Sequence, residues 1–190
     1  MEFKEILKRR TIRFFKQQPL AREDFNAMLE AARQASCASN KQRLRYIVVQ
    51  TKELVDAILP HTAYAGLVTP RRNPEINKTA PAAFLVMLAE DTSGKHIYAD
   101  AGAAVQSIQF AAWERGIGCC WLGSFKPEKV AELLNLKDPA KIIYLIAVGY
   151  PAENPVTEDI DADGNPAYYL DDNDTLHVPK FTVDAITEWM

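Results

Sequence analysis

The sequence predicts a single domain, residues 1–190, of α/β or α+β class, with at least two helices packed on a sheet of about four strands. Two observations support this prediction. Hydrophobic residues make up 48% and charged residues 25% of the 190 positions, a composition that supports one folded core. Stretches with apolar residues at helical spacing are interspersed with short runs of β-branched residues, so both kinds of element are expected along the chain.

Helices are expected where apolar residues recur every three or four positions. In residues 19–35, one face carries the apolar residues Phe25, Met28, Leu29 and Ala32. Residues 97–116 are apolar around most of the helix circumference, which is typical of a buried helix. The remaining helices are expected at residues 2–10, 52–59, 126–136 and 181–189.

Strands are expected at short apolar runs bounded by turn residues, namely 46–51, 82–90, 119–123 and 141–151. Two segments fit neither pattern. Residues 61–80 contain Pro70 and Pro74 and predict a mobile loop or lid. Residues 151–179 are polar and acidic and predict a long arm outside the core.

Composition argues against several classes of protein. The formal net charge is −3, whereas general nucleic-acid binders are usually basic, so no nucleic-acid partner is expected. No apolar run approaches the roughly 20 residues that span a bilayer, and the N-terminus lacks a signal-peptide pattern, so we expect no membrane association and a cytoplasmic location. The three cysteines suggest packed side chains rather than a disulfide framework, and the three histidines have no metal-ligand spacing, so no metal is expected.

A cationic cluster stands out in "KRRTIRFF", where Lys8, Arg9, Arg10 and Arg13 lie within six residues around the hydroxyl of Thr11. Fixed guanidinium donors together with a hydroxyl suit a phosphate group. The other interpretation of the cluster is a solvated helix end.

Five blocks in order along the chain resemble the FMN-dependent nitroreductase family. They are "RRTIRFF", "CASNKQRLRYIVV", "DAGAAVQSIQFAAWERGIGCCWLG", "AVGYP" and "LHVPK". The resemblance implies an α+β fold with a mixed sheet flanked by helices, a long C-terminal arm and an intertwined homodimer. It also implies FMN sites at the dimer interface, each lined by both subunits.

The resemblance also implies roles for individual residues. Arg9, Arg10 and Thr11 would bind the FMN phosphate and ribityl chain, and Arg13 would lie by the pyrimidine edge of the flavin. The other positions that match the family's cofactor contacts are Ser36, Cys37 and Ser39 from the partner subunit, Asn40 and Gln42 near the ring and ribityl groups, Trp121, Leu122 and Gly123 at a strand end, and Lys180 as a second phosphate contact.

The activity that the resemblance implies is a ping-pong oxidoreduction. NAD(P)H would pass a hydride to flavin N5, and a nitroaromatic, a quinone or a similar small-molecule acceptor would then take the electrons. The cofactor carries this chemistry, so we name no catalytic side chain. Tyr64, Arg71 and Arg72 are candidates to cover the flavin and contact substrate, although residues 61–80 could equally form an ordinary surface loop.

Three alternatives stay open at this point. The chain could bind or sense flavin without NAD(P)H turnover. It could run another flavin reaction of the same family, such as reductive dehalogenation. It could also be an interaction protein whose basic N-terminal segment docks on an acidic partner.

Overall fold

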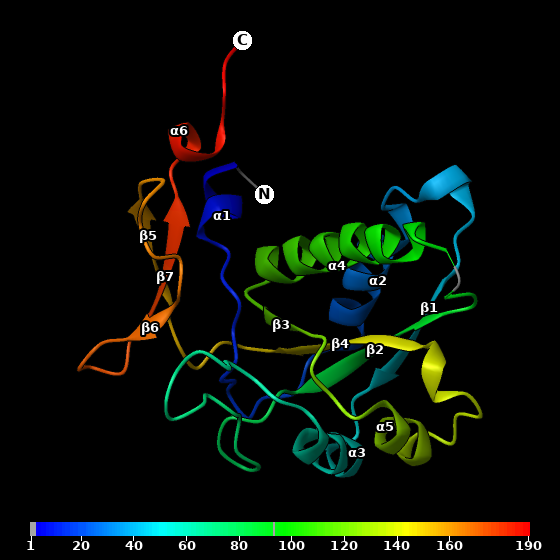
Figure 1. Ribbon diagram of the computed structural model, residues 1–190. Helices are drawn as coiled ribbons and strands as arrows, with labels where there is room; N and C mark the ends of the chain where they lie inside the picture. The colour runs from blue at the N-terminus through cyan, green and yellow to red at the C-terminus, as the bar shows by residue number, and fades with distance from the viewer. Residues whose placement is uncertain (1–2, 93) are drawn as a thin grey trace.

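The computed structural model describes residues 3–92 and 94–190. The predicted α+β class is confirmed: a central sheet lies between two layers of helices (Figure 1). Helices α2, Arg22–Gln34, and α4, His96–Glu114, cover one face, and helices α3, Lys52–Ile58, and α5, Pro127–Leu133, cover the other. The sheet is therefore buried on both sides.

The central sheet has the strand order β1-β2-β4-β3, and every neighbouring pair is antiparallel. Parallel pairing, which the expected mixed sheet requires, occurs at the isolated bridge between Thr11 and Cys119 and in a second sheet. The strands of the central sheet are β1 at Leu44–Val49, β2 at Ala83–Ala89, β3 at Gly118–Leu122 and β4 at Ile142–Gly149.

Alternate residues of β2 build the two halves of the core. Phe84 and Val86 pack with the α3 and α5 side, whereas Leu85 and Met87 pack with the α2 and α4 side. All four are fully buried. A strand buried on both faces needs a nearly continuous apolar sequence, which is why residues 82–90 could be recognised as a central strand.

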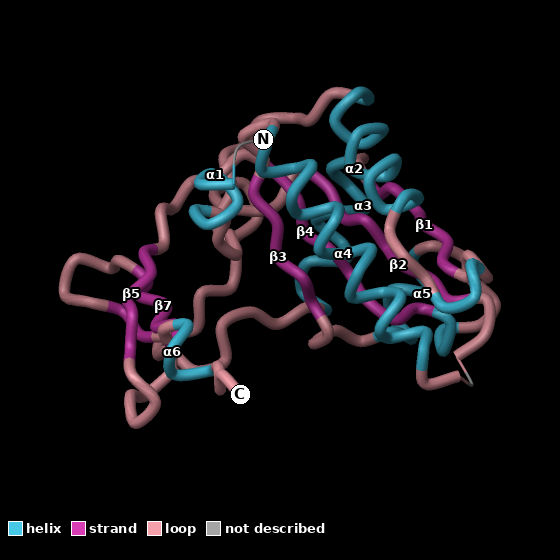
Figure 2. The backbone as a smooth tube through the Cα atoms, turned by 90° about the horizontal axis from the view of Figure 1, so that it is seen from above, coloured by secondary structure: helices cyan, strands magenta, loops and turns pink. Residues whose placement is uncertain are grey.

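The predicted arm has more structure than expected. It carries a small sheet of order β5-β7-β6, with β5 at Val156–Ile160, β6 at Tyr169–Leu170 and β7 at Leu176–Phe181. This sheet lies beside α1, Phe3–Lys8, in both Figure 1 and Figure 2, away from the central sheet. Residue 2 of the helix expected at 2–10 lies outside the described residues.

Two other expectations are corrected by the structure. The helix expected at residues 181–189 is reduced to α6, Val183–Ile186, because Phe181 still belongs to β7 and no residue of α6 is buried. Residues 61–80 lack regular secondary structure for most of their length, yet they are anchored, since Val68 and Ala80 lie in the core. None of the described helices is both long and apolar enough to cross a membrane.

Candidate functional site

The cationic segment is held in a fixed position beside β3. The backbone amide of Ile12 donates to the carbonyl of Cys119 at 3.0 Å, and that of Lys16 donates to Tyr150 at 2.8 Å. Ile12 and Phe15 are buried. Two glycines make this packing possible: a Cβ on Gly118 would lie 2.5 Å from Cγ1 of Ile12, and one on Gly149 would lie 3.0 Å from Cδ1 of Phe15. The side chains of this segment therefore project from a rigid backbone.

Two arginines of this segment carry buried nitrogen atoms without partners. Nη1 of Arg9 and Nε of Arg13 have no hydrogen-bond acceptor within residues 3–92 and 94–190. Burial lowers the pKa of Arg9, although an arginine stays charged in practice. A positive charge that is taken from water without a counter-charge is unfavourable, so these donors suit an anionic ligand such as a phosphate.

The neighbouring residues of the segment have other contacts. Arg10 donates from Nη1 to the carbonyl oxygens of Leu7, at 2.8 Å, and Arg9, and from Nη2 to the hydroxyl of Thr157 on β5. Arg10 thus ties the segment to the arm. The guanidinium of Arg13 lies 5.4 Å from the ring centre of Tyr168, which also belongs to the arm. Thr11 pairs with β3 through its bridge to Cys119.

The strand end that was predicted to pass the flavin ring adjoins this segment through β3. Trp121 is 40% exposed and meets the ring of Tyr144 edge-on at 5.0 Å. Leu122 is buried and Gly123 is exposed. Lys180 is exposed on β7, opposite Asp159 of β5. The structure thus gathers Arg9–Arg13, the start of β3 and the arm at one end of the molecule, whereas Trp121 lies beside Gly102 in the first half of α4.

Residues 36–42 lie at the other end of α4. The carboxylate of Asp100, in the first half of α4, accepts the backbone amide of Ala38 at 2.8 Å, whereas the start of β3 and the cationic segment adjoin the last turn of this helix (Figure 1). From Asp100 to the last residue of α4, Glu114, the helix rises about 21 Å, at 1.5 Å for each of 14 residues. One chain alone therefore does not bring residues 36–42 to the unpartnered arginines.

The backbone of this second segment is unusual. Ser39, Asn40 and Gln42 have positive φ angles of 53°, 50° and 49°, which side-chain-bearing residues seldom adopt and which occur more often at ligand sites. Ser36, Cys37 and Gln42 border a cavity of about 290 Å³ together with Asp100. The predicted partner-side residues thus share one exposed, preformed edge.

The three predicted gate residues are not grouped on an open lid. Tyr64 and Arg72 are 3% and 5% exposed, and Arg71 beside them is exposed. Nε, Nη1 and Nη2 of Arg72 all donate to carboxylates. The structure therefore places Tyr64 and Arg72 in the interior, which differs from the substrate-covering position predicted for them.

Comparison with known sequences identifies the family. The profile described as "Nitroreductase family" matches residues 6–150, most of the chain. The chain belongs to the nitroreductase family. A protein of Archaeoglobus fulgidus named "Putative NADH dehydrogenase/NAD(P)H nitroreductase" is 28% identical over 171 residues, which cover 86% of this chain and 92% of that protein.

Solved structures agree with this assignment. A nitroreductase family protein of Clostridium novyi NT has a TM-score of 0.66 and 28% identity, covering 80% of this chain and 86% of its own. A Desulfovibrio desulfuricans protein described as "a putative nitroreductase in complex with fmn" has a TM-score of 0.65 and 26% identity, with coverages of 82% and 88%. The predicted family and its α+β fold are thus confirmed, and the intertwined homodimer stays a prediction. The family profile matches residues 6–150 and so includes the cationic segment but not the arm. The arm residues that contact the cationic segment are therefore not part of the match.

Two carboxylates of this nitroreductase-family chain were missed in the sequence. Asp100 positions residues 36–42, and Glu153 accepts the backbone amides of Arg13 and Phe14. A signal for Asp100 did exist, since it is the sole charged residue between Ile97 and Trp113 in a mostly apolar helix. Glu153 follows the "GYP" turn in an acidic stretch, where nothing local distinguishes it from surface residues.

Proposed function

We propose that this chain is an FMN-dependent oxidoreductase that uses NAD(P)H and reduces a nitroaromatic, a quinone or a similar small acceptor. The observation that carries the proposal is the pair of buried, unpartnered guanidinium nitrogens of Arg9 and Arg13 in a member of the nitroreductase family. The relatives named above support it, one by its NAD(P)H nitroreductase name and one by its complex with FMN.

The residues of the cationic segment fit the charged end of FMN. Arg9 offers a guanidinium with one buried nitrogen and Thr11 a hydroxyl, and together they would hold the phosphate. Arg13 would contribute positive charge toward the ring and so favour electron uptake. Bound FMN would supply a two-electron carrier that takes a hydride from NAD(P)H and hands the electrons to the acceptor. The protein's own part is to bind, orient and charge-stabilise that carrier.

We further propose that the active form is a homodimer in which residues 36–42 of one subunit complete the pocket of the other. Within one chain these residues contact α4 at Asp100, about 21 Å along the helix from the last turn beside the cationic segment, by the rise of 1.5 Å per residue. Exposed apolar side chains also mark the two terminal segments: Phe3 is 71%, Ile186 69% and Trp189 83% exposed. A partner subunit that covers them would remove this apolar surface from water.

The first experiment is to purify the chain and identify its chromophore. We expect yellow protein that releases FMN, and not FAD, on denaturation, because the site offers cations for one terminal phosphate and the sequence has no Gly-rich dinucleotide turn. Anaerobic mixing with NADH and with NADPH should bleach the flavin with at least one of the two. Colourless protein that takes up no added FMN would refute the proposal, and flavin that neither donor bleaches would reduce it to flavin binding.

Sedimentation at micromolar concentration tests the dimer. The expected mass is twice that of the 21.3 kDa chain. A monomeric mass with FMN still bound would contradict the shared pocket, since residues 36–42 of the same chain lie too far away to complete it.

A further inference from the structure

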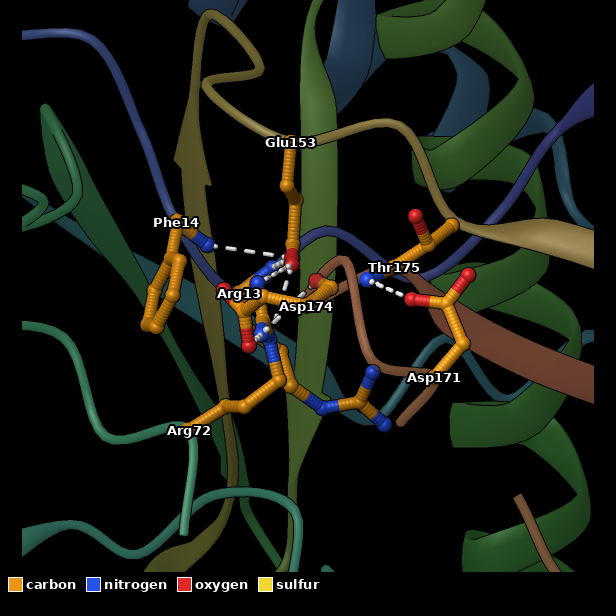
Figure 3. A network of polar contacts seen from close by, with 7 residues as sticks. All are labelled: Arg13, Phe14, Arg72, Glu153, Asp171, Asp174 and Thr175. Atoms are coloured by element: carbon orange, nitrogen blue, oxygen red, sulfur yellow. Dashed lines mark hydrogen bonds and ion pairs between the residues drawn. The ribbon is translucent and has the colours of Figure 1, made fainter. Parts of the chain in front are cut away.

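A buried network of charges lies directly under the cationic segment. The carboxylate of Glu153 accepts the backbone amide of Arg13 and, at 3.1 Å, that of Phe14 (Figure 3). Its other oxygen accepts Nε and Nη2 of Arg72 at 3.2 and 3.0 Å. The side chains of Glu153 and Arg72 are each 6% exposed, so their charges depend on each other rather than on water.

Each guanidinium nitrogen of Arg72 already donates to a carboxylate. Its Nη1 donates to the side chain of Asp174 at 2.7 Å, and its guanidinium lies 4.3 Å from the ring centre of Phe14. The network thus joins three distant parts of the chain, which are the cationic segment, the 61–80 loop and the arm. Asp174 is 73% exposed, so the buried charge that Arg72 balances is that of Glu153.

Arg13 is a second cation close to Glu153 along the backbone, because the carboxylate binds the backbone amide of this residue. Its guanidinium nevertheless makes no hydrogen bond to the residues that the structure describes, and its Nε is buried. A carboxylate without Arg72 would be a buried charge in need of a partner, and the flexible side chain of Arg13 could supply one.

We infer that Arg72 is a positioning residue for the flavin site: it neutralises Glu153 and thereby leaves the guanidinium of Arg13 free for the cofactor. The inference rests on the proposed flavin binding by Arg13. It replaces the substrate-contacting role predicted for Arg72 with an indirect one, in which Arg72 never touches the flavin. It also gives the arm a part in the site, since Asp174 holds the far side of Arg72.

Charge and shape can be separated with three variants. Arg72→Gln removes the charge but keeps a donor toward Glu153, Arg72→Lys keeps the charge, and the double variant Arg72→Gln/Glu153→Gln makes the pair neutral. Exposed Arg22, at the start of α2, provides the matched control Arg22→Gln. Each variant is first checked for a cooperative thermal unfolding transition.

FMN affinity is then measured by fluorescence titration. Arg72→Gln should bind FMN about tenfold or more weakly, the loss expected when one charge-assisted hydrogen bond is diverted. Arg72→Lys, the double variant and Arg22→Gln should stay within about threefold of the parent protein, because none of them leaves Glu153 with an unpaired charge. Unchanged affinity in Arg72→Gln, or a double variant no better than Arg72→Gln, would overturn the inference. If Arg72→Gln does not fold, weakened binding in either the double variant or Arg72→Lys overturns it.

A second readout needs no flavin. In the FMN-free protein, the Nε–H resonance of Arg13 should shift and exchange more slowly with water in Arg72→Gln, because Glu153 now accepts it. The double variant should restore the parent signal. If the Nε–H resonance of Arg13 has the same shift and exchange rate in Arg72→Gln as in the parent protein, the inference is contradicted even where FMN binds. Failure of the parent protein to bind FMN would instead refute the proposed function, and the resonance would still decide whether Arg72 keeps Arg13 free.

Discussion

Arg72 is buried and Arg9 is partly buried, but their guanidinium groups differ in whether the chain supplies acceptors for them. All three guanidinium nitrogens of Arg72 donate to two carboxylates, and its face lies on Phe14. Arg9 has a buried nitrogen with no acceptor among the described residues. The sequence presents both as arginines in basic pairs, "RR" at 9–10 and at 71–72. Only the pairing distinguishes a structural cation from one that is available to a ligand.

The difference has an energetic meaning. A buried ion pair with good hydrogen bonds is close to neutral overall, but the loss of one partner leaves an uncompensated charge. The buried nitrogen of Arg9 has no counter-charge even in the parent protein, so burying it is unfavourable before any mutation. Arg72 should therefore matter most to folding, and Arg9 most to binding.

The largest expected effect separates the two arginines by stability. Arg72→Ala should lower the free energy of unfolding by about 3–5 kcal/mol, because it strands the charge of Glu153. Arg9→Ala should change it by less than about 0.5 kcal/mol or raise it, since it removes a desolvated, unpaired charge. Urea denaturation of the FMN-free proteins measures both values. Equal losses of unfolding free energy in Arg72→Ala and Arg9→Ala would contradict the distinction between a structural arginine and a ligand-binding one.

The next effect concerns binding and redox potential. Arg9→Ala should weaken FMN binding by about 1.5–3 kcal/mol, the contribution of a charged hydrogen bond, and leave the midpoint potential of residual bound flavin unchanged. Arg13→Ala should lower that potential, because the flavin loses nearby positive charge when it takes up electrons. FMN and redox titrations of both variants test the division. If both lose affinity alike and neither changes the potential, the cluster is a general anion patch.

A smaller effect is expected in the arm, where the ionic groups are paired but half-exposed. The carboxylates of Asp171 and Glu158 raise the pKa of His177, which also stacks on Tyr169 at 4.8 Å. A histidine with a raised folded-state pKa stabilises the fold fully below its unfolded value of about 6.5 and loses that contribution as the pH rises through the folded value.

Hydrogen exchange of β6 and β7, corrected for intrinsic rates, should therefore show protection that is greatest below about pH 6.5 and falls as the pH rises through the raised pKa of His177. His177→Gln should abolish this pH dependence. His96→Gln, at the exposed start of α4, serves as the control and should retain it. Protection that is flat with pH in the parent protein would show that the cluster does not hold the small sheet.

The smallest effect concerns the thiols beside the two unpaired arginines. Burial raises the pKa of both Cys119 and Cys120 to about 12, and the nearby charges of Arg9 and Arg13 offset this only in part. At about pH 8 these thiols should resist alkylation in the native protein, whereas the half-buried Cys37 reacts. Arg9→Ala should change nothing. Mass spectrometry after iodoacetamide treatment reads each site, and labelling of Cys120 as fast as Cys37 would contradict the burial argument.

Local patterns were enough to predict most of the core. The apolar runs of β2 and α4 predict buried elements, because a strand that is buried on both faces and a helix that is buried around most of its circumference must be apolar there. The cation density of "RRTIR" is also visible locally, so the candidate anion site could be singled out before the structure.

What the sequence could not reveal depends on distant contacts. Arg72 lies in a proline-containing polar loop that resembles surface, and its burial is set by Glu153, 81 residues away. Glu153 in turn binds the amide of Arg13 across 140 residues. No local period or propensity encodes such pairing. The prediction of a terminal helix at residues 181–189 was wrong for a related reason. The apolar pattern there indicates a helix, but no residue of α6 is buried against another element, so only Val183–Ile186 is helical.

The most direct measurement of the central claim compares FMN with riboflavin, which lacks the phosphate, in the parent protein and in Arg9→Ala. Isothermal titration gives four dissociation constants. If the unpaired guanidinium of Arg9 exists to receive a phosphate, the parent protein should prefer FMN over riboflavin by at least about tenfold, and Arg9→Ala should lose most of that preference while binding riboflavin as before. Equal affinities for the two flavins in the parent protein, or a preference that survives Arg9→Ala, would contradict the account.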